Sequence, residues 1–153
     1  MKEFEVYTDG GCSPNPGNGG FGVVILSGGK VCEQRVGGEP ETTNNRMEFM
    51  AAIVGLEHLP VNCKAVVYSD SQLLCKIATG VYKPRKNRDL CEKLFAQMAL
   101  RTVEFKWVRG HSGNRLNERC DKIATWSIGQ TMKRKEKWGS GVEYNPPVAF
   151  EET

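Results

Sequence analysis

Four acidic residues could act together in this chain if its fold brings them close. They are Asp9, Glu48, Asp70 and Asp121. Clustered carboxylates repel, and at about 4 Å and an effective dielectric near 20 two of them cost about 4 kcal/mol. No lysine or arginine lies in the short segments around Asp9 and Asp70 to neutralise them. Such a cluster indicates a binding site for hard divalent cations, which prefer oxygen ligands.

The hydrophobic pattern predicts the elements that must position these acids. Apolar residues alternate or run together in the expected strands, which span residues 4–8, 21–26, 31–36, 65–69 and 103–107. Helical spacing predicts helices from a cap at Thr42 or Thr43 to about Leu59, over 72–78, from Asp89 onward, and along a face of Leu116, Cys120, Ile123 and Ser127. The segment 10–20, rich in Gly, Pro and Asn, reads as a loop.

The resulting order, β-β-β-α-β-α-α-β-α, predicts an α/β fold. We expect a five-stranded mixed sheet with strands 1–3 antiparallel, strands 4 and 5 parallel, and helices on both faces. Asp9 and Asp70 would each lie at the carboxyl end of a strand, where ligands gather in such sheets. If the first and fourth strands are neighbours, these two aspartates meet.

The composition is that of an ordinary globular domain. The 153 residues are 39% hydrophobic and 25% charged, with a net charge of +3. No run of 18 apolar residues predicts a membrane span, and the N-terminus lacks the apolar core of a signal peptide, so we expect a cytoplasmic protein. The six cysteines lack the spacing of a zinc site and read as reduced residues, most of them in the core. We expect a domain over residues 1–129 and a basic, partly flexible tail over 130–153.

Three further features each have a functional and a purely structural interpretation. Gly17 to Gly22 matches the spacing of a dinucleotide-binding loop, but an extended run follows it instead of the required helix, so the glycines more plausibly let a hairpin approach another backbone. His111 lies between two glycines and is either a surface residue or a proton carrier on a mobile loop. Glu57 lies roughly opposite Glu48 on its helix and reads as a surface acid.

With these residues in place, the chain closely resembles the type I ribonuclease H family. The resemblance covers residues 1 to about 128 and rests on stretches in the family's order: YTDGGC (7–12), TTNNRME (42–48), SDSQ (69–72), WVRGHSG (107–113) and NERCD (117–121). It implies the RNase H-like fold and hydrolysis of the RNA strand of RNA–DNA hybrids, leaving 5′-phosphate and 3′-hydroxyl ends. It also implies that Asp9, Glu48, Asp70 and Asp121 hold two Mg²⁺ ions, with Mn²⁺ able to substitute, and that His111 assists proton transfer or product departure.

Substrate selection needs contacts that sense a 2′-hydroxyl. Polar groups suited to this lie near the acids: the amides of Asn15, Asn44, Asn45 and Gln72 and the backbone around Gly11 and Cys12. The resemblance places Asn44 and its neighbours on the two strands at the cleavage site, and it implies that Thr43 and Asn87 bind a phosphate of the DNA strand. Helix capping is an alternative role for Asn44 and Asn45, compatible with substrate binding.

The chain departs from the family's pattern in its basic regions. The basic protrusion that many members carry after Gln72 is shortened to residues 80–88, and Glu41 stands where a basic residue often helps the phosphate pocket. We expect weaker intrinsic affinity for the hybrid, partly restored by the basic tail and by Lys83, Arg85, Lys86 and Arg88.

Two other functions compete with hybrid cleavage. A DNA-cutting relative with the same sheet, such as a transposase or resolvase, is disfavoured by the intact TTNNRME and GHSG motifs. A non-catalytic nucleic-acid-binding module would be expected to lack one of the four acids, and all four are present. The partner we expect is therefore the RNA–DNA hybrid, bound by a monomer with no membrane and no obligate protein partner.

Overall fold

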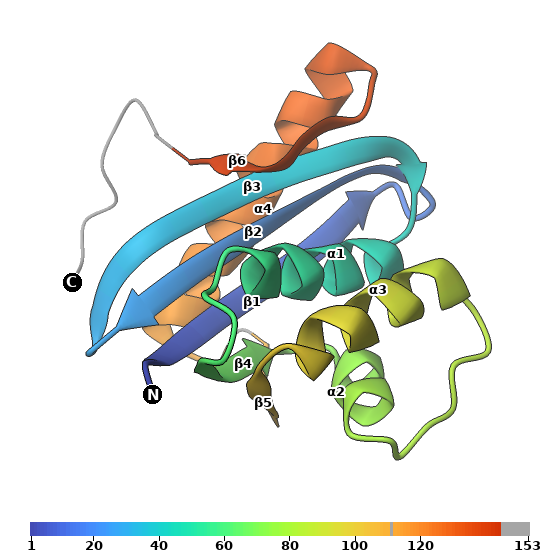
Figure 1. The fold of residues 1–153 in the computed structure, drawn as a ribbon. Coiled ribbons are helices and arrows are strands. Elements are labelled where there is room, and N and C mark those ends of the chain that lie inside the picture. Colours follow the sequence, from blue (N-terminus) through green and yellow to red (C-terminus); the bar gives the residue numbers. More distant parts are fainter. Residues whose placement is uncertain (111, 145–153) are drawn as a thin grey trace.

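A single mixed sheet forms the centre of the molecule in the computed structural model, which describes residues 1–110 and 112–144 (Figure 1). The strands are β1 (Glu3–Ser13), β2 (Gly17–Ser27), β3 (Lys30–Thr42), β4 (Lys64–Ser69), β5 (Thr102–Trp107) and β6 (Trp138–Glu143). The helices are α1 (Asn44–Glu57), α2 (Gln72–Ala78), α3 (Arg88–Ala99) and α4 (Arg115–Arg134).

The strand order is β5-β4-β1-β2-β3-β6. β1, β2 and β3 pair antiparallel, whereas β4 is parallel to both β1 and β5. The predicted mixed sheet is thus confirmed, including the adjacency of the first and fourth strands. Among the described residues, none of the helices combines the length and apolarity that crossing a bilayer requires.

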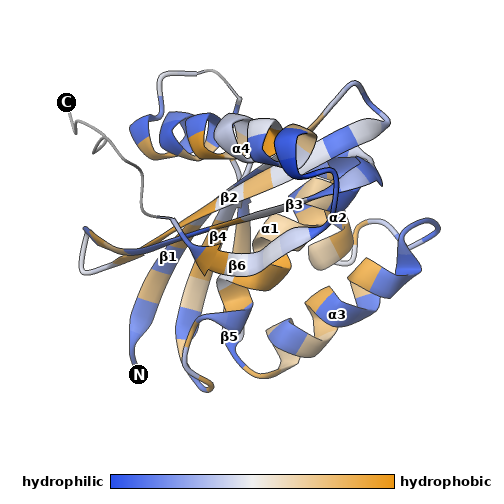
Figure 2. Cartoon of the chain, turned by 90° about the horizontal axis from the view of Figure 1, so that it is seen from above, coloured by the Kyte–Doolittle hydropathy of each residue, from blue (hydrophilic) through white to orange (hydrophobic). Residues whose placement is uncertain are grey.

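Helices cover both faces of the sheet, as expected (Figures 1 and 2). On one face, α1 lies against β1 and β2, with α2 and α3 beside it; on the other face lies α4. The α1 side holds the larger core, with Val6, Phe21, Val23 and Phe49 at 2% exposure or less. Because α1 is enclosed by the sheet and by α3, apolar residues surround it on most sides.

The sixth strand comes from the segment expected to be a tail. α4 continues through Gln130 to Arg134, and β6 then pairs antiparallel with β3. Trp138 anchors this strand, since its ring is buried and its indole N–H donates to Thr131 Oγ1 at 2.8 Å. The strand could not be predicted from its basic and glycine-rich sequence, because a single buried tryptophan fixes it to the sheet and no alternating hydrophobic pattern is present.

The glycine-rich segment expected as a loop is also largely strand. β1 and β2 stay paired from Asp9–Gly22 to Ser13–Asn18, leaving only a short turn between them. Glycine and asparagine have low strand propensity, but here the glycines admit neighbouring backbones that side chains would keep out.

Candidate functional site

Three of the predicted acids converge where the neighbouring strands β1 and β4 diverge, inside the sheet rather than at an outer strand. Asp9 comes from β1, Glu48 from the second turn of α1, and Asp70 directly follows β4. One carboxylate oxygen from each lies within 4.8 Å of the others. Asp9 and Glu48 are only 6% and 8% exposed, whereas Glu57, the expected surface acid on the same helix, is exposed. The sequence therefore identified which acid of α1 faces the cluster.

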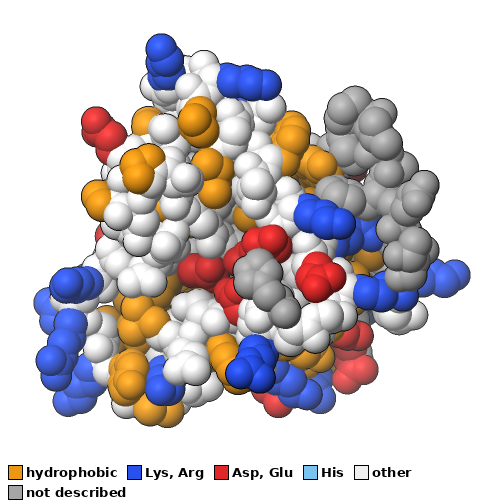
Figure 3. All heavy atoms as spheres, turned by 180° about the vertical axis from the view of Figure 1, so that it is seen from behind, with side chains coloured by type: hydrophobic (Ala, Val, Ile, Leu, Met, Phe, Trp, Pro, Cys, Tyr) orange, Lys and Arg blue, Asp and Glu red, His pale blue; other side chains and the backbone are white. Residues whose placement is uncertain are grey.

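Asp121 joins the three acids from the other face of the sheet. It lies on α4, forms a side-chain hydrogen bond with Asp9, and lines the same cavity of about 370 Å³. Beyond the four acids, that cavity is bordered by Gly10, Gly11, Asn44, Asn45, Ser71, Ala124, Thr125 and Ile128. Figure 3 shows acidic side chains gathered near the middle of one face, with lysine and arginine side chains around them and at the periphery.

The cavity opens where two parallel strands part. The pairing of β1 with β4 stops at Tyr7 and Tyr68, and Thr8 Oγ1 donates to the Tyr68 carbonyl at 3.0 Å. Beyond this point β1 continues to Ser13, so Asp9 lies inside a strand rather than at its end as predicted. The chain after β4 instead turns away into α2, and the divergence leaves room between Asp9 and Asp70.

Gly10 brings α1 against β1. A Cβ atom at Gly10 would lie 2.3 Å from the Met47 carbonyl carbon and 2.5 Å from Glu48 N, distances that real contacts do not reach. The Gly10 N–H also donates to Asp9 Oδ1 at 3.0 Å and to Glu48 Oε1 at 3.4 Å. The absence of a side chain at Gly10 is therefore what lets the Glu48 carboxylate reach Asp9.

Glycines in the segment 17–22, which does not form a dinucleotide site, let α4 come close to the sheet. A Cβ at Gly20 would lie 2.5 Å from Ile128 N, and one at Gly22 would lie 2.8 Å from the Ile123 side chain. The expectation that these glycines allow another backbone to come close is confirmed. Their contact with α4 brings Asp121, about two turns before Ile128, to the cavity.

Burial and mutual repulsion hold the acids away from their ordinary ionisation. Burial, followed by the charges of Asp70 and Asp121, raises the pKa of Asp9 to about 8. Burial, followed by the charges of Asp9 and Asp70, also raises the pKa of Glu48 well above its usual range. A cation bound between these carboxylates would oppose both effects and favour their ionised forms.

Two groups that support the acids were not predicted from the sequence. Ser69 is fully buried, and its hydroxyl donates to Glu48 Oε2 at 3.4 Å while accepting from Ser71 N at 3.0 Å. Trp107 Nε1 donates to the Asp70 carbonyl at 2.9 Å. The Ser-Asp-Ser and Trp-Val-Arg motifs contain both residues, but which atoms meet depends on β5 lying beside β4.

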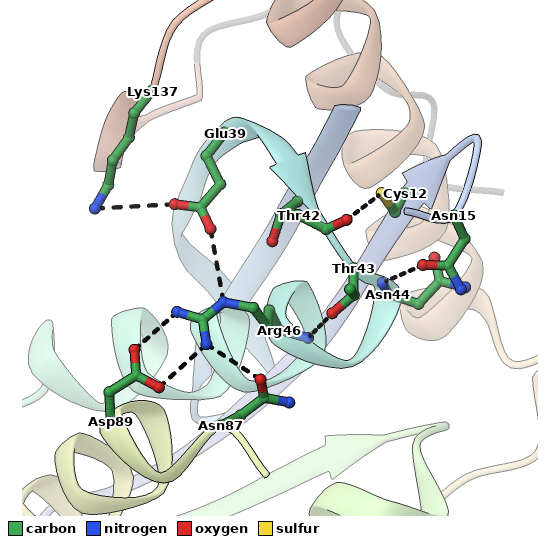
Figure 4. A network of polar contacts seen from close by, with 10 residues as sticks. All are labelled: Cys12, Asn15, Glu39, Thr42, Thr43, Asn44, Arg46, Asn87, Asp89 and Lys137. Carbon is green, nitrogen blue, oxygen red and sulfur yellow. Dashed lines mark hydrogen bonds and ion pairs between the residues drawn. The ribbon is translucent and has the colours of Figure 1, made fainter. Parts of the chain in front are cut away.

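A polar network lies at the start of α1, next to the acids (Figure 4). Thr43 caps the helix by accepting from Arg46 N at 3.2 Å, and Asn15 Oδ1 accepts from Asn44 N at 3.1 Å. The Arg46 guanidinium donates to Asn87 and to both carboxylate oxygens of Asp89. The network ties the β1–β2 turn and the first turn of α3 to the first turn of α1.

Only some of the other predicted site residues border the acidic cavity. Gly11, Asn44 and Asn45 line the acidic cavity. The Cys12 thiol is instead engaged by the carbonyls of Pro14 and Thr42, at 3.2 and 3.3 Å. Gln72 is exposed at the start of α2 and is not among the residues that border the cavity. His111 lies outside the described residues.

The shortened basic segment borders a cavity of its own. This space of about 600 Å³ is lined by apolar residues, among them Phe49, Leu73 and Ile77, and by the basic residues Lys83, Arg85 and Lys86. Asn45 borders both this cavity and the acidic one, so the two are adjacent. Glu41 is exposed and has a left-handed backbone, with φ of 53°.

This geometry can be set beside known proteins. Residues 1–128 match the family described as RNase H. A Ribonuclease H of Alcanivorax borkumensis is 42% identical over 149 residues, which cover 89% of this chain and 97% of that protein. One of Trichodesmium erythraeum is 46% identical over 136 residues, which cover 80% and 86%.

Solved structures give the same comparison. LC11-RNase H1, isolated from compost and solved in complex with an RNA/DNA hybrid, matches with a TM-score of 0.75 and 28% identity, over 84% of this chain and 99% of that one. The N-terminal RNase H domain of a Mycobacterium tuberculosis protein, with a TM-score of 0.78, 23% identity and 88% and 99% coverage, is similar in fold.

Proposed function

Because the chain belongs to the RNase H family, we propose that it is an endonuclease that hydrolyses the RNA strand of RNA–DNA hybrids. The products would carry 5′-phosphate and 3′-hydroxyl ends. One observation carries the proposal: carboxylates from β1, α1 and the end of β4 lie within 4.8 Å of one another in a cavity that a fourth acid borders. The hybrid bound to LC11-RNase H1 supports the choice of substrate.

The four acids fit divalent cations of the Mg²⁺ class. All their ligand atoms are carboxylate oxygens, which suit hard cations, and no described lysine or arginine borders the cavity. Asp9, Glu48, Asp70 and Asp121 would hold two Mg²⁺ ions, with Mn²⁺ able to substitute. Ions at this position would supply the Lewis acidity that activates water and stabilises the leaving 3′-oxygen.

The chain's own groups orient these ligands. Asp9 has both Glu48 and Asp121 as neighbours and would hold metal together with either of them. The Gly10 N–H and the Ser69 hydroxyl donate to the two oxygens of Glu48, so the side chain is fixed from both sides. His111 is proposed to move a proton during cleavage or product departure.

The DNA strand would be held through Thr43 and Asn87. The Thr43 oxygen accepts from Arg46 N, which leaves its hydroxyl hydrogen free to donate. The Asn87 oxygen accepts from Arg46 Nη1 at 3.2 Å, which leaves its NH₂ group free to donate. Two groups whose acceptor atoms are already occupied present donors outward, and donors are what a phosphate requires.

The RNA strand would be read by amides and backbone beside the acids. Asn15 resembles Asn87 in having its oxygen occupied, so that its NH₂ group remains available. Gly11, Asn44 and Asn45 border the cavity and can reach a 2′-hydroxyl next to the scissile phosphate. Cys12 and Gln72 remain proposed contacts through backbone and side chain respectively. All six cysteines are free, which is compatible with the cytoplasmic setting proposed for the chain.

An end-labelled substrate series tests this function. The protein with Mg²⁺ is incubated with an RNA–DNA hybrid and, separately, with single-stranded RNA, duplex RNA and duplex DNA. We expect cleavage of the RNA strand of the hybrid alone, with 5′-phosphate products. Cleavage of duplex DNA would favour the DNA-cutting relatives instead, and no cleavage with either Mg²⁺ or Mn²⁺ would refute the proposal.

A further inference from the structure

Arg46 joins the first turns of two helices. Its Nη1 donates to Asn87 Oδ1 at 3.2 Å and to Asp89 Oδ1 at 3.1 Å, and its Nη2 donates to Asp89 Oδ2 at 2.8 Å (Figure 4). Its Nε faces Glu39 at 4.0 Å. Three groups of this chain therefore surround one guanidinium, and two of them are negatively charged.

This arrangement fixes which end of the Asn87 amide faces outward. A guanidinium has donors and no acceptor, so the atom of Asn87 that meets it must be the oxygen. The NH₂ group is then directed away from Arg46. Without Arg46, the amide could turn over and present an acceptor oxygen, which a phosphate would repel.

The backbone and capping of Asn87 are also unusual. Asn87 is the N-cap of α3 but lies in the left-handed region, with φ of 54°, and makes no side-chain hydrogen bond to the helix. An N-cap side chain ordinarily accepts from the helix's own amides. Here the oxygen that would do so is given to Arg46.

We propose that Arg46 is a positioning residue for the DNA strand, which sets the amide of Asn87 so that its NH₂ group meets a phosphate. The inference rests on the proposed function. Asp89 accepts hydrogen bonds from both terminal nitrogens of Arg46. The guanidinium is therefore bound to a carboxylate of the protein and would not be the group that binds the phosphate.

Direct binding of the phosphate by Arg46 is the competing role. Asp89 and Glu39 flank the guanidinium and would repel a third anion. The two roles predict different couplings. A positioning residue acts only through Asn87, so its substitution should change nothing once Asn87 is gone, whereas a direct contact should add its own effect.

The test is a double-mutant cycle on hybrid cleavage with Arg46→Lys, Asn87→Ala and both together. Lysine keeps the charge but cannot form the planar fork. We expect each single variant to raise KM about tenfold with kcat within about twofold, the size of one lost hydrogen bond to a charged group. The double variant should equal Asn87→Ala alone. A hybrid with neutral methylphosphonate linkages in its DNA strand should remove the difference between Arg46→Lys and the unsubstituted protein.

Arg101 provides a matched control at the other end of the same helices. It donates to Gln97 O at 3.0 Å and to Leu59 O at 2.8 Å, tying the end of α3 to the chain after α1. Arg101→Lys should lower the melting temperature and leave KM unchanged. Additive KM effects of Arg46→Lys and Asn87→Ala, or an unchanged KM in Arg46→Lys, would overturn the proposal. Failure of the unsubstituted protein to cleave the hybrid would instead refute the proposed function.

Discussion

The acidic cavity and the polar network beside it are built on opposite principles. In the cavity, four carboxylates are crowded together, and the pKa of Asp9 rises to about 8 because burial and like charge oppose its ionisation. In the network, every charge has a partner: Arg46 meets Asp89 at 2.8 Å and lowers the pKa of that carboxyl to about 2. In the proposed function, the first region would hold a cation and the second would present hydrogen-bond donors to an anion.

Both regions are anchored in the first two turns of α1. Thr43 and Arg46 begin the helix, and Glu48 follows on the next turn. A metal-bound RNA phosphate and a DNA phosphate would therefore be positioned from one rigid element, and the spacing between the two strands of the substrate would be set by the helix itself. Substitutions that separate the two regions energetically are the sharpest tests of this comparison.

Removing a carboxylate should have the largest effect. Asp9→Asn and Asp70→Asn should lower kcat by on the order of 10³-fold or more, because several kcal/mol of metal-assisted stabilisation is lost at about 1.4 kcal/mol per tenfold. Folding should survive, since an amide replaces a repelled charge. Cleavage rates and far-UV circular dichroism check both expectations.

Glu57→Gln is the control for that prediction, because Glu57 is an exposed acid on the same helix as Glu48. Its activity should remain at the level of the unsubstituted protein. If Asp9→Asn and Glu57→Gln were equally active, the acidic cavity could not be the catalytic centre.

The second prediction separates α1 from β1. In Gly10→Ala the new methyl would overlap the backbone at Met47 and Glu48, so α1 must shift and the Glu48 carboxylate must leave Asp9. We expect a loss of about 1–3 kcal/mol of stability and, since misplacement by about 1 Å can cost 10²-fold, a fall in kcat of about that size.

Gly129→Ala is its matched control. Gly129 lies within α4, and an added Cβ meets nothing within 4 Å. Replacing a helical glycine of this kind should raise stability by about 0.5–1 kcal/mol and leave cleavage unchanged. Chemical denaturation of the two variants measures the contrast, and equal stabilities would contradict the role given to Gly10.

These two regions also differ in how much the sequence could reveal. The convergence of Asp9 and Asp70 followed from the strand order, and the inward face of α1 followed from helical periodicity. The orientation of Asn87 could not be predicted, because it depends on a guanidinium 41 residues away along the chain. β6 was missed for a different reason: its anchor, Trp138, is fixed by a local contact with Thr131, and the strand has no alternating hydrophobic pattern that would predict it.

The third prediction concerns pH in the absence of metal. Between its unfolded pKa of 3.8 and its folded pKa of about 8, Asp9 holds a proton in the folded protein that the unfolded chain has released. Unfolding therefore releases a proton, and the stability should fall as the pH rises through this window, with a limiting slope of about 1.4 kcal/mol per pH unit. The melting temperature with EDTA should accordingly be lower at pH 8 than at pH 5.

Asp9→Asn should flatten this dependence and melt higher than the unsubstituted protein at pH 8. Asp89→Asn, in the polar network, should leave the slope between pH 5 and 8 unchanged, because the Asp89 carboxyl is already ionised throughout that range. Identical slopes in the unsubstituted protein and Asp9→Asn would show that the crowding of the carboxylates has no consequence for stability.

The smallest effect is expected where the polar network meets the basic end of α4. Lys137 Nζ lies 4.0 Å from Glu39, which in turn faces Arg46, so the exposed lysines 133, 135 and 137 extend the donor side of the molecule. Deleting residues 130–153 would also remove β6, so point substitutions are required. Replacing the three lysines with glutamine should raise KM a few-fold at moderate salt. The slope of log KM against the logarithm of the salt concentration should fall by up to about 0.9 per lost phosphate contact.

Lys2, Lys30 and Lys64 are the matched set, since they lie at the opposite end of the sheet from Asp9. If both triple variants changed KM equally, general charge rather than an extended binding surface would account for hybrid affinity.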